Sequence, residues 1–324
     1  MTTMRVLGSK DVDALVSVEL ALDAARAAAA AAAAHSVISG RVQVSGEVGW
    51  MRILAGMVTD LDLLGYKEFH RVGKHVRYHV HLFRESTGEP YGIVDGRRIT
   101  SLRTAATAAV AAEHWAAHRR GPHAVGVIGS GEEAREGLRA LAGALEISGV
   151  RVYSPTPANR EAFAAEMSEE IGVRVEPSSN VEEALRVADV GYIATSSQQT
   201  PFLGDEVSGR LGLLLAIGAT RPEHRELEGS VFLRATTVVV DTRDALHEAG
   251  DCIAASREGF DASSAVLLGD YLRRAPGSGA GSVLFKSVGS VEQDLVLAHH
   301  LLREAERTGI GRAVDGIASL RVMR

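Results

Sequence analysis

The stretch "VGVIGSGEEA", residues 125–134, decides the fold of this chain. It contains the pattern G-x-G-x-x-A at Gly129, Gly131 and Ala134, after an apolar run and before the helical sequence "EEAREGLRALAGALE". The first glycine permits a tight turn, the second lets the backbone approach a pyrophosphate, and the alanine keeps the helix close to the sheet. The phosphate is then favoured by the N–H groups and dipole of the helix N-terminus. The pattern predicts a dinucleotide-binding loop made of Gly129, Ser130, Gly131, Glu132, Glu133 and Ala134.

The end of the next expected strand, in "VRVYSPTPANRE", bears on the choice of dinucleotide. It lacks the Asp or Glu that binds a ribose 2′-hydroxyl, and Ser154, Thr156 and Arg160 stand there instead. Small hydroxyls with an arginine favour a 2′-phosphate, so we expect NADP(H) in preference to NAD(H). The alternative is that Thr156 and Asn159 only cap the following helix.

Strand and helix patterns alternate after Gly121-Pro122, which predicts βαβ units and a parallel sheet. Before that point, a helical pattern over residues 9–35, starting at Ser9 as a cap, precedes short alternating segments between residues 41 and 96. A second helix over 99–121, capped by Thr100 or Ser101, closes this part. We therefore expect an α/β protein with a Rossmann dinucleotide-binding domain over 121–299. An N-terminal α+β domain for substrate binding and dimerisation would cover 1–120, with about 300–324 returning to it.

The composition restricts the kinds of partner that the protein can bind and the cellular compartment in which we expect it. The chain has 324 residues and a formal net charge of −6, without a long run of Lys or Arg, which argues against a nucleic-acid partner. Its one cysteine, Cys252, excludes an intrachain disulfide and a cysteine-based metal site. The N-terminal residues lack the layout of a secretory signal, and no apolar run is long enough for a bilayer. We expect a cytoplasmic protein without a membrane partner.

The alternating segments are unusually cationic. Residues 41–103 hold ten Lys or Arg against seven Asp or Glu. In "HVRYHVHLF", Arg77, His79 and His81 fall on one face of the expected strand. This face is either a solvated sheet surface or a pocket for an anionic substrate, because arginine holds carboxylates well. No third ligand is spaced to complete a metal site with the two histidines, so we expect no metal.

Motifs along nearly the whole chain resemble those of the ornithine cyclodeaminase/μ-crystallin family. They are "LGYKEF" (64–69), "TGEPYGIVDGRRITSLRTAATAAVAA" (87–112), "GVIGSGEEA", "IATSS" (193–197), "IGATRPEHREL" (217–227) and "VLFKSVGSVEQDL" (283–295). The resemblance implies a Rossmann domain that binds NAD(P) and a homodimer built through the sheet of the N-terminal domain. It also implies a small anionic amino-acid or imino-acid substrate.

The resemblance also suggests roles for single residues. Lys67 and Arg103 match the family's lysine and arginine that bind the substrate carboxylate beside the nicotinamide, and Arg41 matches a further carboxylate-binding arginine. Positions that usually contact the cofactor are matched by Thr104, Thr195, Ser196, Gly218, Ala219 and Ser287.

Two departures from the cyclodeaminase pattern concern the distal end of the substrate. Thr220 stands where those enzymes carry an acid/base Asp, and Arg52 aligns with a second acidic position. Exchanging a carboxylate for a guanidinium repels a protonated amine and attracts a carboxylate. The departures argue against ornithine as the substrate.

The hypothesis is an NAD(P)-dependent oxidoreductase acting on a C–N bond next to a carboxylate, either reducing an imine or oxidising an amino acid or opine-like amine. Lys67 and Arg103 are the expected catalytic residues, with Lys67 or His79 as proton donor. Arg52 and Arg77 suggest a substrate with several carboxylates, as in diaminopropionate biosynthesis, and Arg41, His79 and Thr220 complete the expected substrate site. The alternatives are an ornithine cyclodeaminase, forming proline and ammonia, and a non-catalytic, crystallin-like NADPH-dependent ligand-binding protein.

Overall fold

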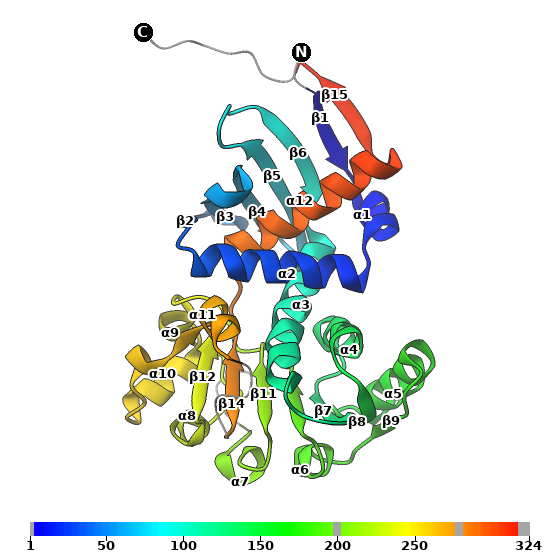
Figure 1. Cartoon of the computed structure of the whole chain (residues 1–324), viewed down its shortest axis with the longest axis vertical. Helices are drawn as coiled ribbons and strands as arrows, with labels where there is room; N and C mark the ends of the chain where they lie inside the picture. The colour runs from blue at the N-terminus through cyan, green and yellow to red at the C-terminus, as the bar shows by residue number, and fades with distance from the viewer. Residues whose placement is uncertain (1–2, 197–201, 276–280, 317–324) are drawn as a thin grey trace. The chain divides into compact units, whose positions relative to one another are not determined.

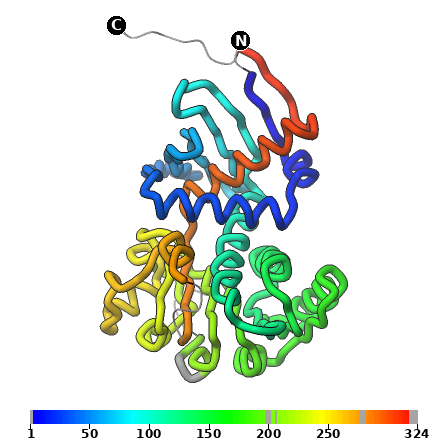
Figure 2. The backbone as a smooth tube through the Cα atoms, in the orientation of Figure 1, coloured from blue at the N-terminus to red at the C-terminus, as the bar shows by residue number. Residues whose placement is uncertain are grey.

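The computed structural model describes residues 3–196, 202–275 and 281–316. Contacts between residues divide the chain into two compact units. Unit 1 contains the described residues up to Arg103 together with those from Ser290 onward, and unit 2 contains Thr104–Gly289. The chain passes from unit 1 to unit 2 within helix α3 (Arg97–Ala116) and returns after strand β14 (Val283–Lys286) (Figure 2). We expected the boundary near residue 121. The contacts divide the chain earlier, between Arg103 and Thr104.

Unit 1 is built on a seven-stranded sheet with the order β15-β1-β6-β5-β4-β3-β2 (Figure 1). All neighbouring strands are antiparallel except β1 and β6, which are parallel. The strands are β1 (Thr3–Leu7), β2 (Val37–Ser45), β3 (Gly49–Val58), β4 (Leu63–Val72), β5 (His75–Arg84), β6 (Pro90–Asp95) and β15 (Arg312–Asp315), with a 3-10 turn, η1 (Thr59–Leu61), between β3 and β4. The short alternating segments expected between residues 41 and 96 are confirmed as β2 to β6, although β2 starts earlier, at Val37. Strands β1 and β15 were not predicted.

Helix α12 (Val291–Thr308) packs on one face of this sheet, and helix α2 (Val18–Ala33) packs on α12 (Figure 1). The sheet can accept α12 closely because glycines stand under it. A Cβ added at Gly65 would lie 3.0 Å from the Leu295 side chain, and one added at Gly92 would lie 2.5 Å from that of Leu302. The alanine-rich face of α2 is largely buried, which lets the two helices approach.

Three expectations about the helices of unit 1 were wrong. The helix expected over 9–35 is two helices, α1 (Ser9–Leu15) and α2, because Val16 is extended and Ser17 caps α2 by accepting the Leu20 N–H. Gly8, not Ser9, is the N-cap of α1. Helix α3 starts before the expected caps, at Arg97, whose N–H is accepted by Asp95.

Unit 2 is built on an eight-stranded sheet with the order β13-β12-β14-β11-β10-β7-β8-β9, and every neighbouring pair is parallel. The strands besides β14 are β7 (His123–Ile128), β8 (Ile147–Tyr153), β9 (Val175–Pro177), β10 (Val190–Ile193), β11 (Leu213–Ala216), β12 (Thr237–Val240) and β13 (Val266–Leu267). The connecting helices are α4 (Glu132–Ala144), α5 (Pro157–Ile171), α6 (Val181–Leu185), α7 (Asp205–Ser208), α8 (Gly229–Arg234), α9 (Ala245–Glu248), α10 (Gly250–Arg257), η2 (Ala262–Ser264) and α11 (Leu268–Arg273).

The strand order of unit 2 reverses between β7 and β10. From β7 the chain first runs outward through β8 to β9, and it then returns to β10 on the other side of β7. Such a reversal leaves a crevice beyond the carboxyl ends of the strands, where doubly wound sheets bind ligands. The parallel Rossmann sheet and the α+β unit that precedes it confirm the predicted fold class.

Candidate active site

Lys67 is a buried cation on the α12 face of the unit 1 sheet. It lies on β4 two residues beyond Gly65, and its side chain is only 3% exposed. Its ammonium donates to Thr100 Oγ1 and to Asp294 Oδ1, both at 2.8 Å. The rings of Phe69 and Tyr78 lie within 6.0 Å of Nζ. A charged amine is thus held in a partly aromatic surrounding by a carboxylate and a hydroxyl.

Arg103 reaches the same carboxylate from α3. Its Nε lies 3.4 Å from Asp294 Oδ1, and its Nη1 donates to Gln293 Oε1 at 3.3 Å. Asp294 is 1% exposed and faces both cations from α12. The structure therefore brings together the two residues expected to bind the substrate carboxylate, around an acid that was not predicted.

The missed acid, Asp294, has a recognisable signal in the sequence. Along α12 the positions of Val291, Asp294, Leu295 and Ala298 fall on one buried stripe, at the spacing of an amphipathic helix. An aspartate on such a stripe needs a partner, because an unpaired buried charge is costly.

Strand register places Arg41 and Arg52 on the same face as Lys67. Arg41 is opposite Leu54, which is opposite Lys67, and Arg52 is opposite Phe69. The Arg52 guanidinium donates to Gln43 Oε1 at 2.9 and 2.6 Å and lies 5.7 Å from the centre of the Phe69 ring.

Arg77 and His79 occupy the opposite face, so the expected grouping of these residues with Lys67 was wrong. In the β4–β5 ladder, Lys67 pairs with Val80 while His79 pairs with Glu68. Because side chains alternate between the two faces of a strand, His79 and Arg77 point away from Lys67. Within unit 1, His79 therefore cannot donate a proton at the Lys67 site.

Glu68 organises that opposite face. His79 Nδ1 lies 2.6 Å from Glu68 Oε1, and His70 Nδ1 lies 3.0 Å from Glu68 Oε2. Burial acts to raise the pKa of Glu68, but the hydrogen bonds from His70 and His79 outweigh it and lower the pKa overall. On this face His79 is held by a carboxylate.

The glycine loop in unit 2 has the geometry that its sequence pattern predicts. Gly129 follows β7 with φ of +117°, and a Cβ there would lie 2.2 Å from the carbonyl oxygen of Ala194. Gly131 is the N-cap of α4, and a Cβ added to it would meet no atom within 4 Å. Ala134 is fully buried against the sheet. The loop therefore leaves open space over the N-terminus of a 13-residue helix, and the residues present fit a dinucleotide pyrophosphate.

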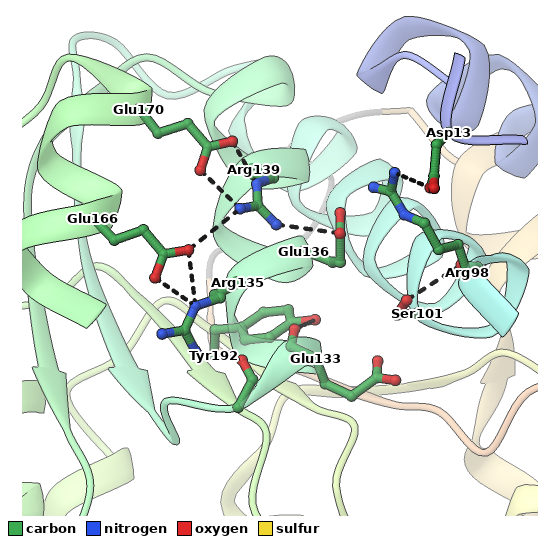
Figure 3. A network of polar contacts seen from close by, with 11 residues as sticks. Asp13, Arg98, Ser101, Glu133, Arg135, Glu136, Arg139, Glu166, Glu170 and Tyr192 are labelled. Carbon is green, nitrogen blue, oxygen red and sulfur yellow. Dashed lines mark hydrogen bonds and ion pairs between the residues drawn. The ribbon is translucent and has the colours of Figure 1, made fainter. Parts of the chain in front are cut away.

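Ion pairs behind this loop tie α4 to α5 (Figure 3). Arg135 Nε lies 2.9 Å from Glu166 Oε2, and Arg139 Nε lies 2.5 Å from Glu170 Oε1. The Arg135 guanidinium also donates to the carbonyl of Ser130 in the glycine loop. The network therefore fixes the loop from the helix side.

The residues expected to choose between NADP and NAD follow β8, in the loop before α5 and in the first turns of that helix. Ser154 is 5% exposed and its hydroxyl accepts from Ser130 Oγ at 2.9 Å, so it joins the glycine loop. Arg160 donates to the Ser154 carbonyl at 3.0 Å. Thr156 is the exposed N-cap of α5, but its side chain makes no capping hydrogen bond, which argues against the capping alternative.

The other expected cofactor positions follow the carboxyl ends of the central strands. Thr195 and the exposed Ser196 come after β10, Gly218, Ala219 and Thr220 after β11, and Ser287 after β14. Because neighbouring parallel strands end at the same edge, these residues lie along the edge that carries the glycine loop. Thr104, 8% exposed, lies on α3, next to Arg103.

A buried carboxylate that was not predicted, Glu226, joins two of these loops. Glu226 is fully buried and accepts from the N–H and hydroxyl of Thr195, at 2.8 and 2.7 Å, and from the Ala219 N–H at 2.9 Å. Burial raises its pKa, although Lys286 and the bond from Thr195 act in the opposite direction. Gly218 is required beside it, because a Cβ there would lie 2.2 Å from Glu226 Oε1.

Two further buried acids form hydrogen bonds to residues at this edge of the sheet. Asp251 accepts from Lys286 Nζ at 3.0 Å and from the Glu226 N–H at 2.8 Å. Asp241, after β12, accepts from Ser287 Oγ at 2.6 Å and from the Gly289 N–H at 2.7 Å. A lysine ending the buried strand sequence "VLFK" was the available sign that a buried acid must lie nearby.

The sequence profile of the Ornithine cyclodeaminase/mu-crystallin family matches residues 66–309, which include Lys67, Arg103, the glycine loop and Asp294. The chain belongs to this family. A Delta(1)-pyrroline-2-carboxylate reductase of Bacillus cereus is 29% identical over 278 residues, covering 81% of this chain and 84% of that protein. A ketimine reductase mu-crystallin of Mus musculus is 30% identical over 218 residues, covering 67% of this chain and 66% of that protein.

Solved structures share the fold along almost the whole chain. The iminosuccinate reductase of Paracoccus denitrificans in complex with NAD+ superposes with a TM-score of 0.88 at 24% identity, covering 97% of this chain and 99% of that one. The Delta(1)-pyrroline-2-carboxylate reductase of Thermococcus litoralis, in complex with NADH and L-proline, gives a TM-score of 0.85 at 24% identity, with 95% and 99% covered.

Across residues 3–196, 202–275 and 281–316, no helix combines the length and the apolar character needed to cross a membrane. The same described residues contain no group of three or more His, Cys, Asp or Glu side chains arranged to hold a metal ion.

Proposed function

We propose that this protein is an NAD(P)-dependent oxidoreductase that reduces a C=N bond next to a carboxylate, or oxidises the corresponding amine. The observation that carries the proposal is the buried pair of cations, Lys67 and Arg103, on an α/β chain with a dinucleotide-type glycine loop. The named relatives that reduce pyrroline-2-carboxylate and ketimines support the same chemistry.

In this proposal, Arg103 and Lys67 bind and orient the substrate carboxylate. Paired N–H donors on a carboxylate give strong, directional bonds, and orientation of the adjacent carbon supplies much of the rate. The bound cofactor supplies the hydride that adds to the imine carbon. The imine nitrogen takes up one proton, and the Lys67 ammonium is the donor that we assign to it.

The cofactor preference that we propose is NADP(H). Of the three residues that follow β8, Ser154 is engaged with the glycine loop, so Thr156, the N-cap of α5, and Arg160, within α5, carry the preference. Neither is acidic, and an acidic side chain there would repel a 2′-phosphate.

For the substrate we propose a small imino or amino acid, with a second carboxylate favoured by Arg52 and Arg41. These two arginines share the face of Lys67. Arg77 no longer contributes to that argument, because it lies on the opposite face. Thr220, in place of an acid/base Asp, argues against an ornithine cyclodeaminase.

We further propose a cytoplasmic homodimer in which the sheet face opposite α12 meets its copy. Exposed apolar side chains gather on this face of β2 and β3: Ile38 is 64% exposed, Val42 53%, Val44 65% and Met51 42%. Apolar area of this kind is unfavourable in water and typical of an interface. Light scattering that gives the mass of two 34.3 kDa chains would support the dimer, and the mass of one would contradict it.

The activity is tested by following the absorbance of NADPH, and separately NADH, with purified protein and a panel of carboxylated imines. The panel contains 1-pyrroline-2-carboxylate, iminosuccinate and mixtures of 2-oxo acids with amines, and ornithine with NAD+ tests cyclodeamination. We expect NADPH oxidation with one imine and the matching amino acid as product. Tight NADPH binding without turnover of any substrate would favour the non-catalytic ligand-binding alternative.

A further inference from the structure

Asp294 is a buried acid in contact with both cations of the carboxylate site. It is 1% exposed, and its Oδ1 lies 2.8 Å from Lys67 Nζ and 3.4 Å from Arg103 Nε. Its other oxygen, Oδ2, is also buried and has no hydrogen-bond partner among the described residues. A buried carboxylate with one unsatisfied oxygen is expensive for folding alone, so its presence calls for a functional reason.

We propose that Asp294 is a positioning residue: it holds the Lys67 ammonium and the Arg103 guanidinium in the arrangement that receives the substrate carboxylate. The proposal rests on the function proposed above and adds a residue to its site. Asp294 itself contacts the cations and would not touch the substrate.

Two physical effects support this role, and the first is positional. Lys67 has a flexible stem of four methylenes, and Thr100 and Asp294 together hold its Nζ at one place. Arg103 is oriented through two consecutive residues of α12, since Gln293 accepts from its Nη1 and Asp294 faces its Nε. The same turn of one helix therefore positions both carboxylate-binding groups.

The second effect is electrostatic. Two cations side by side in a buried site repel each other, and each loses favourable hydration on burial. Asp294 offsets one of the two positive charges, so the cations can stay close together before a substrate arrives. The negative charge of the substrate then completes the neutralisation.

The test is a double-mutant cycle of Asp294→Asn and Lys67→Met, with Glu306→Gln on the exposed side of α12 as the control. The binding probe is pyrrole-2-carboxylate, a planar carboxylate measured by calorimetry with NADP+ present, and kcat and KM are measured for the imine that the panel identifies. NADPH affinity is followed by fluorescence, and thermal unfolding shows whether each variant folds.

We expect Asp294→Asn to weaken pyrrole-2-carboxylate binding and raise KM by about tenfold or more, since displacing a reacting group by about 1 Å can cost about a hundredfold. NADPH affinity should stay within about twofold. In the Lys67→Met background the same change should have a much smaller effect, because the two side chains act together. Asp294→Glu, which keeps the charge and shifts it by one methylene, should be intermediate.

Several outcomes would overturn the proposal. Wild-type affinity for pyrrole-2-carboxylate in Asp294→Asn or, if that variant does not fold, in Asp294→Glu would show that Asp294 positions nothing. Independent effects of the two substitutions would do the same. If the wild-type protein itself neither binds the probe nor reduces any imine, the proposed function fails, and the role of Asp294 fails with it.

Discussion

His299 is a single side chain whose burial makes stability depend on pH. It lies on α12, 8% exposed, beside the rings of Tyr91 and His300. Burial, reinforced by the nearby His300, Arg84 and Arg303, lowers its pKa to about 4 from 6.5. As the pH falls below 6.5, the unfolded chain takes up a proton at this position before the folded chain does. The stabilisation is therefore complete above pH 6.5 and is lost between pH 6.5 and about 4.

We expect the free energy of unfolding to fall between pH 7.5 and pH 5.0 by about 2 kcal/mol through this group, at about 1.4 kcal/mol per pH unit. His299→Gln should lose correspondingly less stability over that interval, whereas the exposed His75→Gln should behave as the wild type does. Urea unfolding at the two pH values measures the difference. An equal loss in His299→Gln and wild type would contradict the assignment.

Among single residues, the sequence predicted several members of the candidate site and missed the buried acids that contact them. Lys67 and Arg103 stand in recognisable motifs, and the structure brings them together. Asp294 and Glu226 lie within quoted motifs, but were missed because a motif does not show which side chain an acid contacts. Lys67 is 227 residues from Asp294 in the chain, and Thr195 is 31 residues from Glu226. Arg77 was misplaced because the face that a side chain takes relative to another strand depends on register, which a single strand does not reveal.

Among the elements, α12 packs against the unit 1 sheet at glycine positions, and one of these, Gly65, leaves little room for a side chain. A Cβ at Gly65 would lie 2.3 Å from the His81 carbonyl oxygen, on the neighbouring strand, and 3.0 Å from Leu295. Gly65→Ala is expected to cost about 1–3 kcal/mol of stability, as overpacked sites do. Gly149→Ala in β8, away from the proposed dimer face, meets nothing within 4 Å and should be neutral or slightly stabilising.

Thermal and urea unfolding of the two variants compare the sites directly. A Gly65→Ala protein as stable as Gly149→Ala would mean that α12 and β5 can move away from β4 at little cost. Because Lys67 is two residues from Gly65 on the same strand, Gly65→Ala should also weaken carboxylate binding, whereas Gly149→Ala should leave it unchanged.

The sequence predicted elements well where periodicity was long and uninterrupted. The strands β2 to β6 and the βαβ units of unit 2 follow their patterns. The break between α1 and α2 was missed, because Val16 and Ser17 interrupt a helical pattern with ordinary residues. Strands β1 and β15 are five and four residues long, and their pairing joins the two ends of the chain, which no local pattern records.

For the chain as a whole, the glycine loop and the alternation of strands and helices were sufficient to predict the Rossmann unit. The family motifs were sufficient to predict the second unit, unit 1. The division of the chain within α3 was not predictable from composition, because the helix continues through it without a break. Motif order thus establishes the architecture, whereas the exact limits of each unit depend on contacts.

Removing the carboxylate from the substrate shows whether Lys67 and Arg103 recognise the carboxylate of an imine. The measurement is the ratio of kcat/KM for 1-pyrroline-2-carboxylate to that for 1-pyrroline, in wild type, Arg103→Ala and the exposed control Arg97→Ala. We predict a ratio above about a thousand in wild type and Arg97→Ala, because two charged donors contribute several kcal/mol. In Arg103→Ala the ratio should fall by about a hundredfold. Equal reduction of both imines, or an unchanged ratio in Arg103→Ala, would show that these two residues do not recognise the substrate carboxylate.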